Sequence, residues 1–291
     1  MGRLLKKNKV YLFIFLILVI VFFVLWLQDL NVFYVCGRYL KEPDYRVWIS
    51  HEINRVTGAE LSGVFHLAYA LMTWPVFSVD TGIPGMDLYS AIVLPVFASI
   101  GSYHLFTRLN REYQLSIHRS GKLDRFIVSE IAKESFKLSC ALFAAIAVNV
   151  LIIFSLQYEV GEEILPMRVL LTDIIHASFI QVHPLFFYLL LSFVEHFVTP
   201  FIWCTSLQLC ALYSTDRKIA ISLPVIIYLA VVYSVDFIQR SHGTLILYLS
   251  PATIMASSYV GINSYGLFLG LLFPVICGLI AYIIRRKSLE I

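Results

Sequence analysis

Residues 6–27 read KKNKVYLFIFLILVIVFFVLWL, a short lysine-rich stretch followed by 18 uncharged residues. About 20 consecutive apolar residues are needed to cross a bilayer as a helix. Lys and Arg are preferentially kept on the cytoplasmic side of such a helix. No small-residue cleavage site follows the run, so it resembles a retained helix more than a signal peptide. The stretch therefore predicts a transmembrane span at Val10–Leu27 that starts in the cytoplasm.

The same combination of basic residues beside an apolar run recurs at Arg108–Lys137 and at Arg285–Lys287. Together with the short loop at 216–218, the segments assigned to the cytoplasm hold 16 of the 22 Lys and Arg residues. The two long segments assigned outside are acidic: 28–87 holds seven Asp and Glu against four Lys and Arg, and 157–183 holds four against one. Charge and hydropathy thus predict one topology, with both termini in the cytoplasm.

The composition indicates an all-α, multi-pass membrane protein. Hydrophobic residues make up 59% of the chain and charged residues 14%, and mean hydropathy is +0.80, whereas a soluble domain carries about 25% charge. The basic residues gather on one side, which fits membrane orientation and not nucleic-acid binding. We expect a single permease-like domain over residues 1–291, with six transmembrane helices at about 10–27, 88–107, 138–156, 191–213, 219–235 and 266–284.

The outer connections carry their own helical patterns. Apolar residues recur at helical spacing within the outer segment 28–87, which predicts amphipathic helices at the outer interface. Short interfacial or re-entrant helices are expected at Val169–Val182 and within 241–265. Because the apolar stretch at 184–213 is too long for one untilted helix, we place the fourth span at its end, with a protruding outer part or a bend at Pro200.

The segment 108–137 is the most informative polar stretch. It breaks at Ser120-Gly121 and then continues with an apolar stripe at helical spacing, formed by Leu123, Phe126, Ile127 and Ile131. We therefore expect an amphipathic helix over Ser120–Glu134 that lies along the inner membrane surface. The alternative is an ordinary positive-inside loop with a surface helix.

Residues 118–127, HRSGKLDRFI, resemble a segment of bacterial ABC-2 type transporter membrane subunits. In that family the second span leads into a motif of roughly Arg-x-Gly-Ser-Arg, followed by an apolar helix that enters the third span. Arg119, Gly121 and Arg125 fit this pattern, with the Ser and Gly transposed and Asp124 as an added acidic residue. The six spans, the cytoplasmic ends and the large outer segment also resemble the family.

The resemblance implies the membrane subunit of an ABC exporter in the bacterial cytoplasmic membrane, with a hydrophobic or amphipathic cargo such as a peptide. It implies a separate cytoplasmic ATPase that binds ATP and Mg²⁺, and a second permease subunit, identical or related. This chain holds no Gly-x-x-x-x-Gly-Lys-Ser/Thr motif, so we expect no enzymatic activity and no cofactor in it. The residues implied to contact the ATPase are Arg119, Gly121, Lys122, Arg125 and Phe126.

Two ionisable residues interrupt an apolar run at Glu195-His196. Charged side chains inside a membrane are costly and usually mark a function, so we expect them along a substrate path. The alternative places Glu195 at the outer interface.

Other functional classes stay open but are weaker. An immunity or sensor subunit would share the topology. A CAAX-type intramembrane protease would need a Glu-Glu-x-x-x-Arg motif, but Glu162-Glu163 stands one residue too far from Arg168 and Pro166 interrupts the helix. The five cysteines form no CxxC pair, so we expect no metal site.

Overall fold

The computed structural model describes residues 2–29, 41–44, 84–112, 123–156, 183–211, 216–242, 249–255 and 264–289, together with 47, 174, 175 and 179. These residues are helical throughout their long stretches and contain no strand, which confirms the predicted all-α class. The main elements are α1 (Gly2–Asp29), α5 (Pro84–Glu112), α6 (Leu123–Leu156), α8 (Pro184–Phe193), the π-helix η4 (Val194–Val198), α9 (Thr199–Ala211), α10 (Arg217–His242), α11 (Pro251–Met255) and α13 (Ser264–Leu289).

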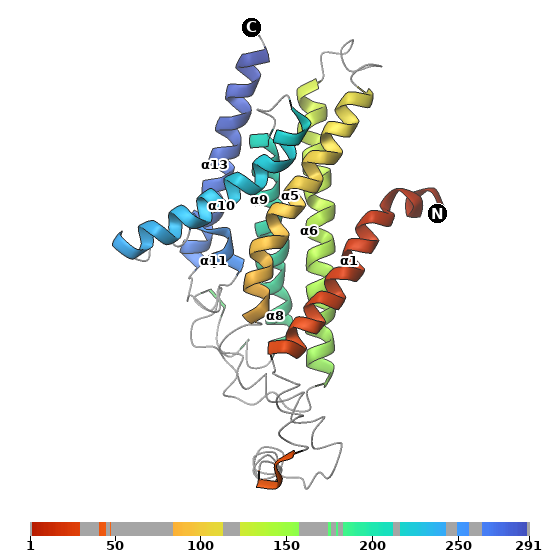
Figure 1. The fold of residues 1–291 in the computed structure, drawn as a ribbon, viewed down its shortest axis with the longest axis vertical. Coiled ribbons are helices and arrows are strands. Elements are labelled where there is room, and N and C mark those ends of the chain that lie inside the picture. Colours follow the sequence, from red (N-terminus) through yellow and green to blue (C-terminus); the bar gives the residue numbers. More distant parts are fainter. Residues whose placement is uncertain are drawn as a thin grey trace.

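Helices α5, α6 and α9 form the centre of a bundle (Figure 1). Helix α1 packs chiefly against α6 and α5, whereas α10 packs against α5 and α9, and α13 packs against α9. The core where they meet is apolar, and small residues such as Ala98 and Ala145 are fully buried in it. Small side chains let helix backbones approach closely, which is the usual way that membrane helices pack.

Among the described residues, four helices are long and apolar enough to cross a membrane: Arg125–Ile152, Leu185–Ala211, Lys218–Val235 and Ser264–Ile284. They indicate a multi-pass membrane protein. The apolar parts of α1 and α5, Lys9–Val24 and Ile92–Thr107, are shorter and coincide with the first two predicted spans. Large apolar side chains stay exposed along the outer faces of α1, α10 and α13, as expected of surfaces that meet lipid.

The helices that flank basic segments end at the same side of the bundle. The end of α5, the start of α6 and the C-terminal end of α13 lie together at the top of Figure 1. Tyr11, near the start of α1, contacts Glu134 in the N-terminal half of α6, so α1 and α6 also begin at this side. The six spans and the cytoplasmic position of both termini stay predictions.

The fourth predicted span is longer than expected and contains a π turn. Helix runs without interruption from Pro184 through η4 to Ala211. The irregularity lies just before Pro200, where a bend was predicted. Proline has no backbone N–H and cannot bond the carbonyl four residues earlier. One residue before the proline, the N–H of Thr199 donates to the carbonyl of Val194, five residues back, and Thr199 Oγ1 donates to the same oxygen at 3.0 Å.

The predicted interfacial helix at Ser120–Glu134 is not a separate element. From Leu123 onward, α6 runs unbroken to Leu156, with no Gly or Pro inside it. Its apolar stripe packs on the bundle, because Ile127 and Ile131 are buried against Leu105 and Leu209. The prediction of a separate surface helix is therefore wrong. Residues 123–134 belong to the same helix as the predicted third span, and the same face of that helix packs on the bundle.

Of the outer segments, the structure describes one helix in 241–265. Helix α11 is short, and Ile254 and Met255 on it are buried. It packs against α5, α9, α13 and η4, as a re-entrant element would. Nearly all of 28–87 and most of Val169–Val182 lie outside the described residues, so the helices predicted there stay predictions.

Candidate functional site

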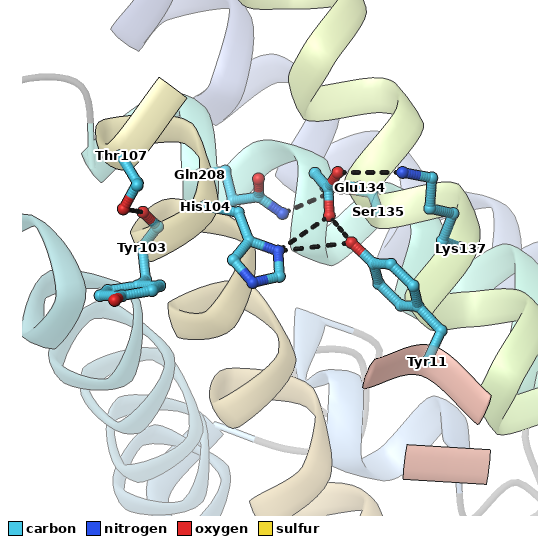
Figure 2. A network of polar contacts seen from close by, with 8 residues as sticks. All are labelled: Tyr11, Tyr103, His104, Thr107, Glu134, Ser135, Lys137 and Gln208. Carbon is cyan, nitrogen blue, oxygen red and sulfur yellow. Dashed lines mark hydrogen bonds and ion pairs between the residues drawn. The ribbon is translucent and has the colours of Figure 1, made fainter. Parts of the chain in front are cut away.

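A buried carboxylate joins three helices near the end of the bundle where α6 begins (Figure 2). Glu134 of α6 is 1% exposed. Its Oε2 accepts a hydrogen bond from the hydroxyl of Tyr11 on α1 and lies 3.2 Å from Nδ1 of His104 on α5. Its Oε1 accepts a hydrogen bond from Nζ of Lys137 at 3.1 Å. We call Tyr11, His104, Glu134 and Lys137 the Glu134 cluster.

The partners of Glu134 also contact one another. Lys137 follows Glu134 by one helical turn, and its Nζ lies 5.1 Å from the centre of the Tyr11 ring, a cation–π contact. The Tyr11 and His104 rings meet edge to face, with centroids 6.3 Å apart. A buried carboxylate is tolerated only when it is paired and hydrogen-bonded. Here one cation and two further polar groups satisfy it, from α1, α5 and α6 itself.

A second polar junction lies beside the cluster. Gln208 of α9 is fully buried, and its Nε2 donates to Ser135 Oγ of α6 at 3.1 Å. Gln208 Oε1, Ser102 Oγ and Ser139 Oγ are also buried, and none of them has a hydrogen-bond partner within the described part of the chain. Buried polar atoms without partners are uncommon in folded proteins and mark places where a polar group can bind.

Glu195 and His196 lie on the π-helix η4 and form a buried pair. The two residues are 7% and 5% exposed, and His196 Nε2 lies 3.8 Å from Glu195 Oε2. His196 Nδ1 has no hydrogen-bond partner among the described residues. Since η4 packs against both α6 and α11, the pair faces the interior of the bundle. π-helical turns often occur at functional sites because they re-aim side chains.

Polar groups continue from this pair along one face of α8, η4 and α9. Buried Ser192, Thr199 and Ser206, together with Trp203 Nε1, stand three or four residues apart on the side of the helix that holds Glu195 and His196. Residues at that spacing share one face. A polar row thus runs along the buried side of an otherwise apolar helix.

The predicted ATPase-contact residues are only partly described. Arg125 and Phe126 lie in the first turn of α6, where Arg125 is exposed and Phe126 is half-buried. Arg119, Gly121 and Lys122 lie outside the described residues. The structure therefore neither brings these five residues together nor separates them.

Sequence reasoning missed the Glu134 cluster, although one signal was present. Ile127, Ile131, Glu134 and Leu138 share one helical face, so a carboxylate stands within a stripe that the bundle buries. Nothing in the local sequence of Tyr11 or His104 points to Glu134, because these contacts join residues 123 and 30 positions apart.

We also looked for a metal site and for similar proteins that would indicate what the Glu134 cluster and the polar row do. Within the described ranges, no group of three or more His, Cys, Asp and Glu side chains is placed to hold a metal ion. Comparisons with protein-family models, curated proteins and solved structures find no match to this chain.

Proposed function

We propose that this chain is the membrane subunit of an ATP-driven ABC exporter. In this proposal its six spans lie in a bacterial cytoplasmic membrane, with both termini in the cytoplasm. A separate ATPase binds ATP and Mg²⁺, and a second permease subunit, identical or related, completes the transport path. The cargo is hydrophobic or amphipathic, for example a peptide. The choice of the ABC-2 type family rests on the resemblance of residues 118–127 to its membrane subunits.

The geometry that best supports the proposal is the way α5 and α6 hold the segment between them. Helix α5 continues to Glu112, beyond its apolar part at Ile92–Thr107, and α6 starts again at Leu123. Leu105 packs against Ile127 and Ile131, and His104 lies against Glu134. The two helices on either side of the segment 113–122 are therefore fixed to each other, and in this proposal the ATPase contacts that segment.

Because α6 is continuous, a movement of that segment can be transmitted along the helix into the membrane. The helix has 34 residues, and a helix rises about 1.5 Å per residue, so it is about 50 Å long. A partner that moves the start of α6 displaces the whole helix, including the part that packs against η4. The polar row beside Glu195 and His196 then provides groups along which a cargo with polar atoms can pass.

Charge reversal of the predicted contact residues tests the proposal. In the wild type, the chain should co-purify with an ATPase subunit and should hydrolyse no ATP alone. The variant Arg119→Glu, Lys122→Glu, Arg125→Glu should insert normally but lose both ATPase binding and transport. A rim charge pair is worth about 1 kcal/mol or less, and a desolvated pair more than about 2 kcal/mol, so all three changes are combined.

The matched control reverses three charges at another cluster, with Arg285→Glu, Arg286→Glu and Lys287→Glu. It makes the same change in net charge and should keep ATPase binding once its insertion is checked. The proposal is wrong if the first triple variant inserts, binds the ATPase and transports like the wild type. ATP hydrolysis by the isolated chain would contradict it as well.

A further inference from the structure

We infer that Glu134 is a coupling residue, which ties the N-terminal helix to the segment that the ATPase moves. This inference rests on the proposed function, and it adds a residue that acts through position and touches neither nucleotide nor cargo. The observation behind it is that one buried carboxylate holds partners on α1, on α5 and within α6 (Figure 2).

Helix α1 lies at the edge of the bundle and packs on it along one face. It packs chiefly against α6 and α5, and a broad apolar face of it stays exposed from Val10 to Val24. Its polar links to the bundle include two that join it to α6. One is the Glu134 cluster, and the other is a hydrogen bond of 3.4 Å from Asn149 Nδ2 to the carbonyl of Val19. The charged link at Glu134 is the stronger kind, because hydrogen bonds to charged groups exceed neutral ones.

The cluster stands close to the segment between α5 and α6. Glu134 lies eleven residues after the start of α6 at Leu123, and His104 lies eight residues before the end of α5 at Glu112. At about 1.5 Å per residue these are roughly 17 Å and 12 Å along rigid helices. Any rotation or sliding of α6 against α5 therefore changes the distance between His104 Nδ1 and Glu134 Oε2 directly.

The cluster is exposed at one edge. Glu134 is buried, but the side chains of His104 and Lys137 are 27% and 31% exposed. A carboxylate that loses its partners has to find others or be hydrated. In this inference the cluster takes two arrangements: the closed one of this structure, in which Glu134 holds α1, and an open one, in which α6 has moved and α1 is released. Switching between them transmits the movement of the ATPase to α1.

The experiment compares Tyr11→Phe and Glu134→Ala with the control Lys133→Gln in the assembled transporter. Lys133 is on the same helix and pairs with Glu130 at 3.0 Å, one turn away, so its loss removes an ion pair within α6. Spin labels replace Leu12 on α1 and Val128 on α6, two exposed positions. The distance distribution between the labels should broaden in Tyr11→Phe and Glu134→Ala and stay narrow in Lys133→Gln.

Coupling is read from the same samples. Transport per ATP hydrolysed should fall about tenfold or more in Tyr11→Phe and Glu134→Ala, the effect expected from losing a hydrogen bond to a charged group. The ATPase should still bind. Tyr11→Phe should have little further effect in a Glu134→Ala background, because the two residues act through one contact.

Unchanged label distances, or normal coupling in both variants, would overturn the inference. If Glu134→Ala fails to insert, Tyr11→Phe, which keeps the ring and removes only the hydroxyl, decides the result. A wild-type chain that recruits no ATPase would overturn the proposed function, and the coupling role with it. Recruitment of the ATPase with unchanged distances in both variants would overturn the role of Glu134 alone.

Discussion

Gly101 of α5 lies directly against the side-chain amide of Gln208 of α9. A Cβ atom at position 101 would stand 2.6 Å from Gln208 Cδ, closer than two carbon atoms can approach. Gln208 in turn donates to Ser135 of α6 at 3.1 Å. The absence of a side chain at Gly101 therefore lets three helices meet at one buried amide.

Gly101→Ala should destabilise the bundle by about 1–3 kcal/mol, the usual effect of overpacking a close-packed core. Thermal unfolding in detergent measures the change. Gly278→Ala is the comparison, because a Cβ there would lie 3.1 Å from Ser206 Oγ and 3.2 Å from Ser206 Cα, a milder crowding than at Gly101. Adding Gln208→Ala to Gly101→Ala should recover part of the loss. Equal stability of Gly101→Ala and wild type would contradict the packing described.

Asn149→Leu should weaken the attachment of α1. Asn149 Nδ2 bonds Val19 O of α1 at 3.4 Å and Ala145 O at 2.9 Å. Interhelical hydrogen bonds in membrane proteins are worth about 0.6–2 kcal/mol, so the expected loss is of that size. Unfolding in detergent provides the measurement. Thr205→Val is the control, because its hydroxyl bonds Phe201 O within a single helix. If the control loses as much stability as Asn149→Leu, the contact with α1 contributes nothing.

Single-cysteine labelling should report the predicted topology. In a background without native cysteines, a membrane-impermeant thiol reagent should label Glu42→Cys and Glu162→Cys in intact cells, because the acidic segments are predicted outside. Lys122→Cys should react only after permeabilisation. Labelling of Lys122→Cys in intact cells would contradict the assignment of both termini and of 108–137 to the cytoplasm.

The pair on η4 should be strongly non-additive. Glu195→Ala or His196→Ala alone removes one member of a buried polar pair 3.8 Å apart and leaves the other polar side chain buried, which costs about 1–3 kcal/mol. Replacing both by Leu should cost less than the sum of the single changes, because neither buried polar group is left behind. Unfolding measurements on the three variants test this. If the double variant folds but transports no cargo, the pair belongs to the substrate path; if it transports normally, its role is structural.

The sequence predicted the helical class and most helix positions because apolar length and charge bias are properties of single segments. It predicted an irregularity at Pro200 for the same reason, since a missing N–H is local. The prediction failed where the position of a side chain depends on a neighbouring helix. The stripe at Ile127 and Ile131 fits a membrane surface as well as a neighbouring helix, and only Leu105 and Leu209 show which one covers it. Tyr11 looks like an ordinary interfacial aromatic until Glu134 is placed beside it.

The link between Tyr11 and Glu134 has a consequence for how the protein is made. The two residues are 123 positions apart, and synthesis proceeds at about 5–20 residues per second, so α1 waits roughly 6–25 s for its partner. Until then the apolar surface of α1 can be covered by lipid and by α5, which is made before α6. Tyr11 lies near the start of that surface, where a phenol can stay hydrated at the lipid boundary. The contact that joins α1 to α6 can therefore form only after Glu134 has been synthesised.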